Sequence, residues 1–216
     1  MNLIQISELI AERAGRQFDK AFKKEIQDMV VYHRAAYMTD SLSRDPSSKI
    51  YFMQSFLVDL EPVSKEECEE MASCGCEDVQ RTVKKIPPTL LISTHPFDYA
   101  GSPGGYQSFG WTTFGSERFL SKGPVTGKRE RHTLLNEYVY VFNNKNLKQL
   151  RLEGLFSDPR RLKEFKCVNS DEPCYSESKD FPIDDRTLKI VVDAILRTEL
   201  RIPIEEKIEV KADSNV

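Results

Sequence analysis

The sequence lacks a long apolar run and an export signal. No stretch approaches the roughly 20 apolar residues that a membrane-spanning helix needs, and the longest candidates, residues 52–60 and 190–196, fit ordinary core elements. The N-terminus starts apolar, but Glu8, Glu12 and Arg13 interrupt it before an apolar core of signal-peptide length is reached. We therefore expect a soluble protein that is made in a reducing cytoplasm.

The sequence also lacks a strong charge of one sign and the motifs of known enzyme classes. Its net charge of −3 gives no global field that would attract nucleic acid. The densest basic run, GKRERH at residues 127–132, could touch phosphates, but Glu130 interrupts it and a solvated turn is favoured. The glycine-rich stretch GSPGGYQSFG has neither the GK[ST] ending of a phosphate loop nor GxGxxG spacing. We assign no catalytic and no cofactor-binding residues and expect no enzyme.

Cysteine is scarce and irregularly spaced. A structural zinc site usually takes its ligands from two closely spaced pairs, and no CxxC pair occurs here. His95 or His132 could complete a ligand set, but nothing in their spacing selects them. An odd number of cysteines without an export signal argues against disulfides. Reduced thiols are the expectation, with no metal ligands assigned, for Cys68, Cys74, Cys76, Cys167 and Cys174.

Three helices are predicted. Ser7 is a plausible N-cap and Gly15 a plausible stop for the first. The second runs from about Asp19 to about Leu42, and its apolar residues recur at steps of three and four. The third begins after Asp184 as N-cap and runs to about Leu200. The expected apolar stripes are Phe18, Phe22, Ile26, Met29, Val30, His33 and Tyr37 on the second helix, and Leu188, Val191, Val192, Ile195, Leu196 and Leu200 on the third.

The middle of the chain predicts strands. YFMQSFLVDLEPV places Phe52, Phe56, Val58 and Leu60 on one face, and IPPTLLIST gives a shorter edge strand. NEYVYVF and LKQLRLEGLF, separated by NNKN, predict a β-hairpin. Residues 95–128 read as a long loop in which WTTF could form a short strand, and the charged C-terminal tail is expected to be extended.

These elements predict an α+β fold, with N-terminal helices and a C-terminal helix packed on a small antiparallel β-sheet with long loops. The chain is interpreted as a single domain over residues 1–216. Within it, residues 1–45 form the N-terminal helices and residues 49–160 a β-rich part containing the long loop 95–128. Residues 161–216 form the C-terminal helix and the extended tail.

Glycines and aromatic residues alternate in the loop 95–128. Half of the chain's glycines fall between Gly101 and Gly115. This mixture is more typical of an ordered, exposed loop whose large side chains pack on a neighbouring chain than of a nucleotide cradle. The candidate partner contacts are Tyr99, Tyr106, Phe109, Trp111 and Phe114.

Four features in order resemble small structural proteins of crAss-like bacteriophages, the short-tailed phages of gut Bacteroidales. They are the helix with DMVVYHRAAYMTDSL, the cysteine-dotted link into RTVKKIPPTLLIS, the pair of strands in NEYVYVFNNKNLKQLRLEGLF, and the ending FPIDDRTLKIVVDAILRTEL. The chain is most similar to ring or adaptor proteins of the head–tail connector, and the resemblance covers most of its length.

The resemblance implies a structural subunit of the virion, made in the host cytoplasm, without catalytic residues. It implies a ring of copies of the chain, expected to be a dodecamer, between the portal protein and the other tail or ring proteins. Genomic DNA would pass through its channel without sequence-specific binding. A zinc-stabilised nucleic-acid-binding regulatory protein that uses the cysteines and GKRERH is the alternative, and an enzyme with an unfamiliar site is a third reading.

Overall fold

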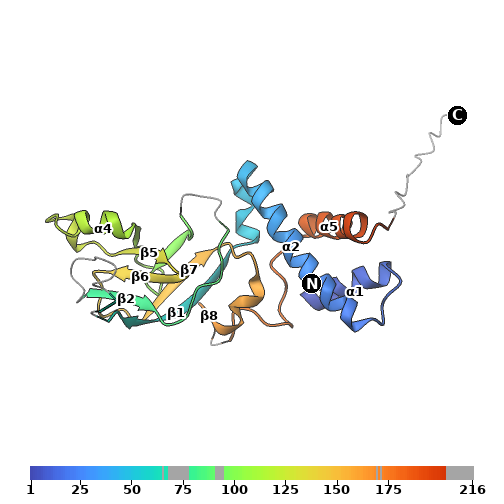
Figure 1. Cartoon of the computed structure of the whole chain (residues 1–216), viewed down its shortest axis with the longest axis horizontal. Helices are drawn as coiled ribbons and strands as arrows, with labels where there is room; N and C mark the ends of the chain where they lie inside the picture. The colour runs from blue at the N-terminus through green and yellow to red at the C-terminus, as the bar shows by residue number, and fades with distance from the viewer. Residues whose placement is uncertain (65, 68–77, 91–94, 169, 171, 203–216) are drawn as a thin grey trace.

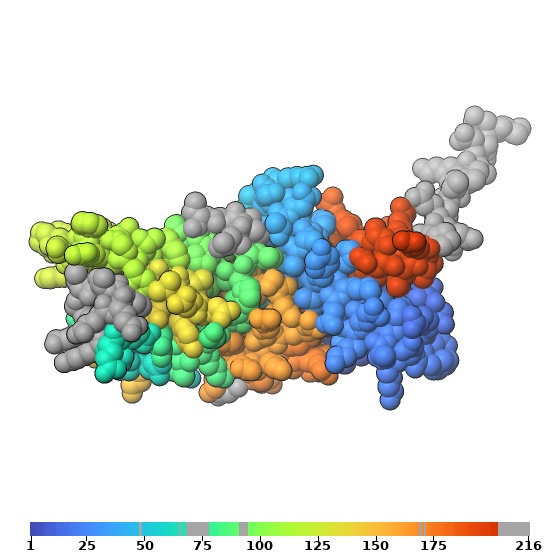
Figure 2. Space-filling view, in the orientation of Figure 1, coloured from blue at the N-terminus to red at the C-terminus, as the bar shows by residue number. Residues whose placement is uncertain are grey.

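The computed structural model describes residues 1–64, 66–67, 78–90, 95–168, 170 and 172–202. The molecule is elongated, with the strands gathered toward one end of its long axis and the helices α1 and α5 toward the other (Figure 1). The long helix α2 stands between them. The space-filling view shows the same order of segments along the long axis (Figure 2).

The helical end is built from α1 (Leu3–Arg13), α2 (Lys20–Arg44) and α5 (Asp185–Ala194), and α5 continues as the π-helical turn η5 (Ile195–Glu199). The predicted cap Asp184 is confirmed, because its carboxylate accepts a hydrogen bond from the Thr187 amide. Asp19, near which the second helix was expected to begin, is the N-cap of α2, and its carboxylate accepts from the Phe22 amide. The stripe of the third helix is confirmed as well. Val191, Val192, Ile195 and Leu196 are buried, and Leu188 and Leu200 are partly buried against the core.

Two details of the N-terminal helices differ from expectation. The cap of α1 is Asn2, which exchanges two hydrogen bonds with Gln5 in a capping box, whereas Ser7 is buried inside the helix. Phe18 precedes α2 and is almost fully exposed. The most deeply buried polar side chain of α2 is Arg34, which the apolar pattern placed outside the stripe.

The sheet is larger than predicted and is mixed rather than antiparallel. It has eight strands in the order β3-β7-β1-β2-β6-β5-β4, and β8 pairs with β1 beside this path. The bounds are β1 (Gln54–Pro62), β2 (Val79–Thr82), β3 (Tyr99–Gly101), β4 (Gly110–Trp111), β5 (Arg131–Leu135), β6 (Tyr138–Phe142), β7 (Gln149–Gly154) and β8 (Lys166–Cys167). The pair β4–β5 is parallel, so the chain between these strands must cross over.

The predicted hairpin is wrong in its pairing although both of its strands exist. β6 pairs with β2 and β5, and β7 pairs with β1 and β3. The hairpin instead joins β5 to β6 through Asn136 and Glu137, both at positive φ (51° and 69°), as a tight two-residue turn requires. The GKRERH run is therefore no solvated turn throughout, because Arg131 and His132 are buried in β5.

Two further expectations are corrected. The strand expected at residues 86–94 is reduced, in its described part, to one bridge between Thr89 and Phe156; residues 91–94 lie outside the description. Residues 95–128 are not a long loop, because they contain β3, β4, the helix α4 (Phe114–Leu120) and the short 3₁₀ turn η3 (Thr126–Lys128). Two further 3₁₀ turns in the described part of the chain are η1 (Pro46–Tyr51) and η4 (Pro159–Glu164).

One cluster of buried side chains runs through both ends of the molecule. It includes Ile6 and Ile26 of the helices and Phe56, Val141 and Leu152 of the sheet. The sheet curls until its edges approach, since the Phe109 amide donates to the Ala100 carbonyl at 2.8 Å. Among the described residues, no helix combines the length and the apolar character needed to cross a membrane.

Candidate interaction surfaces

The five aromatic residues proposed as partner contacts do not form one surface. Phe109 is buried in the core, so it is not available to a partner in this conformation. Trp111 is half-buried between His95 and His132, with ring centroids 5.6 and 5.4 Å away. Phe114 is half-buried against Tyr140 and Phe142.

Tyr99 is the first residue of β3, and Tyr106 lies in the tight turn that follows this strand. The Tyr99 hydroxyl donates to the Gln107 carbonyl at 2.9 Å. A Cβ added to Gly101 would lie 2.1 Å from the same carbonyl, so this position requires glycine. Only Tyr106 is fully presented to solvent, with 96% of its surface exposed. The sequence predicted an exposed loop here, whereas the structure forms strands and a helix in which Phe109 is buried and Trp111 and Phe114 are half-buried.

A stronger candidate surface is the tip, which we define as residues 114–130, the crossover between β4 and β5. It lies at the far end of the long axis, where α4 is seen in Figure 1 and the yellow-green atoms project in Figure 2. Phe119 and Val125 are large apolar residues that remain 75% and 66% exposed on it. They are accompanied by four exposed cations: Arg118, Lys122, Lys128 and Arg129.

The tip is fixed to the sheet by a buried ion pair. Arg131 of β5 donates from Nε and Nη2 to the two carboxylate oxygens of Glu117 on α4, at 2.5 and 2.6 Å. The side chains are only 6% and 4% exposed. A third Arg131 donor binds the Thr126 carbonyl, which fixes the far side of the tip. The exposed apolar and cationic side chains are thus displayed on an anchored element.

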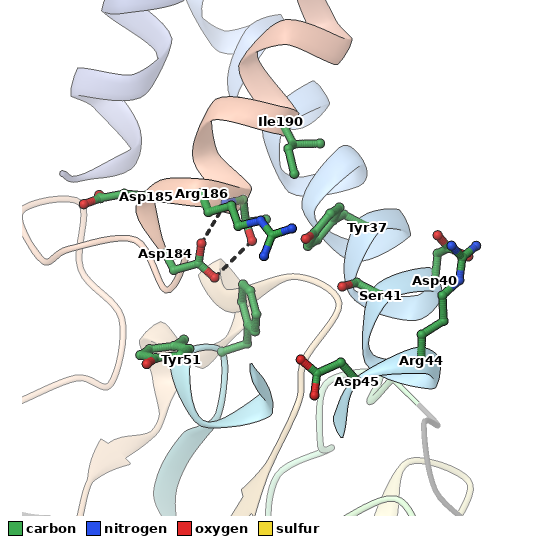
Figure 3. A pocket seen from close by; sticks show the side chains of 12 residues that line it. Tyr37, Asp40, Ser41, Arg44, Asp45, Tyr51, Asp184, Asp185, Arg186 and Ile190 are labelled. Carbon is green, nitrogen blue, oxygen red and sulfur yellow. Dashed lines mark hydrogen bonds and ion pairs between the residues drawn. The ribbon is translucent and has the colours of Figure 1, made fainter. Parts of the chain in front are cut away.

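The second candidate surface is a groove of about 630 Å³ among the helices, which we call the α2–α5 groove. The C-terminal half of α2, the turn η1 and the start of α5 form it (Figure 3). Ile190 and Tyr37 project into it from α5 and α2, and Tyr51 lies at its lower side in Figure 3. Phe52 also lines the groove. Tyr51 and Ile190 are 64% and 40% exposed, so the groove has an accessible apolar lining.

The α2–α5 groove carries more acidic than basic side chains. Four aspartates and two arginines line it: Asp40, Asp45, Asp184, Asp185, Arg44 and Arg186. The Asp45 carboxylate accepts hydrogen bonds from the Ser47 hydroxyl and, at 3.1 Å, from the Ser47 amide, and these hydrogen bonds lower the pKa of Asp45. Its negative charge is therefore maintained in weakly acidic solution. The groove thus has an apolar floor and an acidic rim, and the charge of this rim is opposite to that of the tip.

The two ends of the molecule are tied together by Arg34, which is fully buried on α2. Its Nε donates to the Pro182 carbonyl at 2.7 Å and its Nη1 to the Phe156 carbonyl at 3.1 Å. The guanidinium lies between the rings of Phe52 and Phe181. Burial lowers the pKa of Arg34 to about 9, partly opposed by the charge of Asp158, so the side chain stays cationic at neutral pH.

His132 is buried in the sheet beside Trp111. Its Nδ1 lies 3.2 Å from the Phe109 carbonyl oxygen, and its Nε2 has no hydrogen-bond partner in the structure. Burial lowers the pKa of His132 to about 4, against the smaller raising effect of the Phe109 carbonyl. The imidazole is neutral at pH 7 and packs among aromatic rings. His33, which belongs to the predicted stripe of the second helix, has its Nε2 3.1 Å from Oε1 of Glu199.

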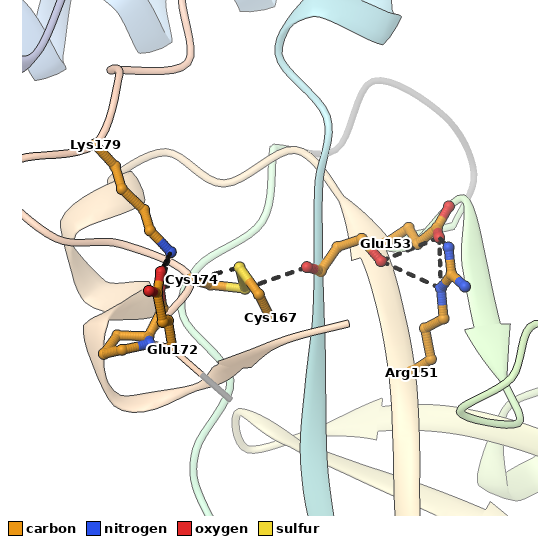
Figure 4. Close-up of a disulfide and its surroundings, with 8 residues drawn as sticks. Arg151, Glu153, Cys167, Glu172, Cys174 and Lys179 are labelled. Carbon is orange, nitrogen blue, oxygen red and sulfur yellow. Dashed lines mark hydrogen bonds and ion pairs between the residues drawn. A yellow bond between two sulfur atoms is a disulfide. The ribbon is translucent and has the colours of Figure 1, made fainter. Parts of the chain in front are cut away.

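The cysteines separate into two groups. Cys68, Cys74 and Cys76 lie outside the described residues, so the expectation of reduced thiols stays a prediction for them. It is wrong for Cys167 and Cys174, which form a disulfide beside the Glu172–Lys179 ion pair (Figure 4). Their Cα atoms are 4.5 Å apart, because the Cys174 amide donates to the Phe165 carbonyl and brings the two segments together. In the described part of the chain, no group of three or more potential ligands is placed to hold a metal ion.

Sequence reasoning missed both the tip and the groove. The tip was assigned to a loop because a seven-residue helix gives little periodicity, although exposed Phe119 within a basic segment was a usable signal. The groove is assembled from α2 and α5, whose sequences are more than 130 positions apart, so no local pattern could reveal it.

The family model described as phage tail ring protein 2, of the crAss-like phages, matches residues 5–215, nearly the whole chain. No curated protein matches the sequence.

Proposed function

The chain belongs to the phage tail ring protein 2 family of crAss-like phages, and from this premise we propose that it is a ring subunit of the head–tail connector. A phage tail ring protein is a structural component of the virion. Beyond that, our proposal places the ring between the portal and the tail, in a dodecamer through whose channel the genomic DNA passes. The family match over residues 5–215 carries the proposal.

The distribution of side chains supports a subunit that repeats around an axis. Such a ring needs two different lateral surfaces on each copy, because each copy contacts its two neighbours through unlike faces. The tip and the α2–α5 groove are two such faces, with opposite charge and exposed apolar residues. The buried ion pair Glu117–Arg131 holds the tip firmly enough for it to serve as a fixed contact.

We further propose that the subunit acts without catalysis and is made in the host cytoplasm. The buried ionisable groups that could have served in a reaction are engaged in packing. Arg34 ties the helices to the sheet, Arg131 and Glu117 anchor the tip, and His132 packs in an aromatic cluster. A net charge of −3 also suits a channel wall that conducts DNA without holding it.

The experiment is to count the chain in purified particles and to locate it. We expect about twelve copies per virion and a ring at the portal–tail junction in averaged electron micrographs. A chain that is missing from purified particles would refute the proposal. A ring located elsewhere in the tail would leave the family assignment intact and refute the connector position.

A further inference from the structure

We propose that the tip of one copy of this chain docks in the α2–α5 groove of the next copy, and that this head-to-tail contact joins neighbours in the ring. The inference rests on the proposed function, since it specifies how the subunits of that ring associate. It commits to a second copy of the chain as the occupant of the groove.

The first argument is charge complementarity. The groove is lined by four aspartates and two arginines, whereas the tip displays four exposed cations. Of the two glutamates in the tip, Glu117 does not reduce this positive charge at the surface, because its carboxylate is buried against Arg131, and Glu130 is half-buried, so the cations remain in excess. Opposite charges on two faces of one chain favour the encounter of unlike faces and disfavour tip-to-tip and groove-to-groove pairing.

The second argument is that both faces carry apolar side chains that are exposed in the structure. Phe119 and Val125 project from the tip, and Tyr51 and Ile190 are exposed in the groove. An apolar centre with a charged rim is typical of protein–protein contacts. The tip lies at the far end of the long axis from the helices that form the groove, so a copy cannot fill its own groove (Figure 1).

The test uses two charge variants of the full chain. A tip variant carries Arg118→Glu, Lys122→Glu and Lys128→Glu and keeps a native groove. A groove variant carries Asp40→Lys and Ile190→Lys and keeps a native tip. Sedimentation velocity over a range of concentrations measures association, and far-ultraviolet circular dichroism with thermal melting checks that each variant is folded. A control variant reverses three exposed lysines outside both surfaces: Lys20, Lys145 and Lys148.

We expect the wild-type and control chains to self-associate with the same affinity, and each surface variant to associate at least tenfold more weakly. The decisive result is the mixture. Tip and groove variants together retain one native tip and one native groove per pair, so the mixture should dimerise at concentrations at which neither variant associates alone. Combining both sets of changes in one chain should restore part of the association, because the charges are then reversed on both faces.

A mixture that does not dimerise although both variants are folded overturns the inference. A wild-type chain that stays monomeric at every concentration also overturns it, since the groove would then serve a different protein. In either case, a ring of this chain in purified particles would keep the proposed function. A chain absent from particles that still associates head to tail would refute the function and keep the contact.

Discussion

Two arginines are buried among the described residues, one at each end of the molecule, and they are held in different ways. Arg131 in the sheet faces a carboxylate, with both Glu117 oxygens within 2.6 Å of its nitrogens. Arg34 on α2 faces no carboxylate at hydrogen-bond distance; its nitrogens donate to the carbonyls of Phe156 and Pro182, and its plane lies near two phenyl rings.

The difference reflects what each arginine connects. Arg131 anchors a surface element, the tip, for which an ion pair gives both direction and specificity. Arg34 joins three segments of backbone in the interior, where carbonyl groups would otherwise lack donors. At the sheet end, removing the carboxylate of Glu117 should therefore cost the most unfolding free energy. At the helical end there is no carboxylate to remove, so the corresponding change is the replacement of Arg34 itself.

The largest effect is expected for Glu117→Ala. This change leaves the Arg131 guanidinium buried without a counter-charge, which costs about 3–5 kcal/mol of unfolding free energy. Urea unfolding at pH 7 measures it. The double variant Glu117→Leu with Arg131→Met should recover most of the loss, because no buried charge remains. As a control, Arg44→Ala breaks an exposed pair with Asp40 and should change stability by less than about 0.5 kcal/mol. A loss below about 1 kcal/mol for Glu117→Ala would show that the tip is not anchored by this pair.

The next effect is acid destabilisation of the sheet end through His132. The pKa of His132 is about 4 in the folded chain and about 6.5 when unfolded, so the folded state binds fewer protons in between. This difference in pKa contributes about 3 kcal/mol to the free energy of unfolding above pH 6.5. The contribution is lost as the pH falls from 6.5 through 4. His132→Phe should remove that part of the pH dependence, as measured by urea unfolding from pH 7 to pH 4. His33→Gln at the helical end is the matched control, because it leaves His132 in place. An unchanged pH profile in His132→Phe would contradict the assignment.

The sequence predicted the helical end more accurately than the sheet end. Helix patterns are local: Asp184 was identified as a cap because a capping residue acts on amides within three positions, and the start of α2 was placed near its cap Asp19. The burial of Arg34 was missed, since its partners Phe156 and Pro182 lie more than 120 positions away. A cation on the flank of an apolar stripe has the same appearance in the sequence whether it is solvated or paired with distant carbonyls.

The existence of three strands could be read from the sequence, but strand pairing could not. The segments of β1, β6 and β7 were predicted because aromatic and β-branched residues concentrate there. The hairpin between β6 and β7 was wrong because NNKN resembled a turn more than Asn136-Glu137 did, and glutamate rarely adopts positive φ. The same error hid β5, whose Arg131 and His132 looked like surface residues until their buried partners were seen.

The third effect concerns Arg34→Met at the helical end, with an expected loss of about 2–3 kcal/mol. The carbonyls of Phe156 and Pro182 lose their donors, but no unpaired charge is left, so the loss should be smaller than that of Glu117→Ala. Arg34→Lys should be worse than Arg34→Met, because a buried ammonium keeps the charge and cannot reach both carbonyls with the same geometry. Urea unfolding of the three variants under one condition decides the order. A loss for Arg34→Met equal to that of Glu117→Ala would end the distinction between the two arginines.

The smallest effect is expected for the loss of the disulfide between Cys167 and Cys174. Cys167 and Cys174 are separated by seven positions, so their disulfide restricts only a short loop of the unfolded chain and stabilises by about 2 kcal/mol. Cys167→Ser with Cys174→Ser should lose this amount in oxidising buffer and nothing relative to the wild type when a reductant is present. Replacing Cys68, Cys74 and Cys76 together by serine is the control and should leave stability unchanged in both buffers. Equal melting temperatures of the wild type and the Cys167/Cys174 variant in oxidising buffer would show that the backbone hydrogen bonds around β8 hold this turn without the disulfide.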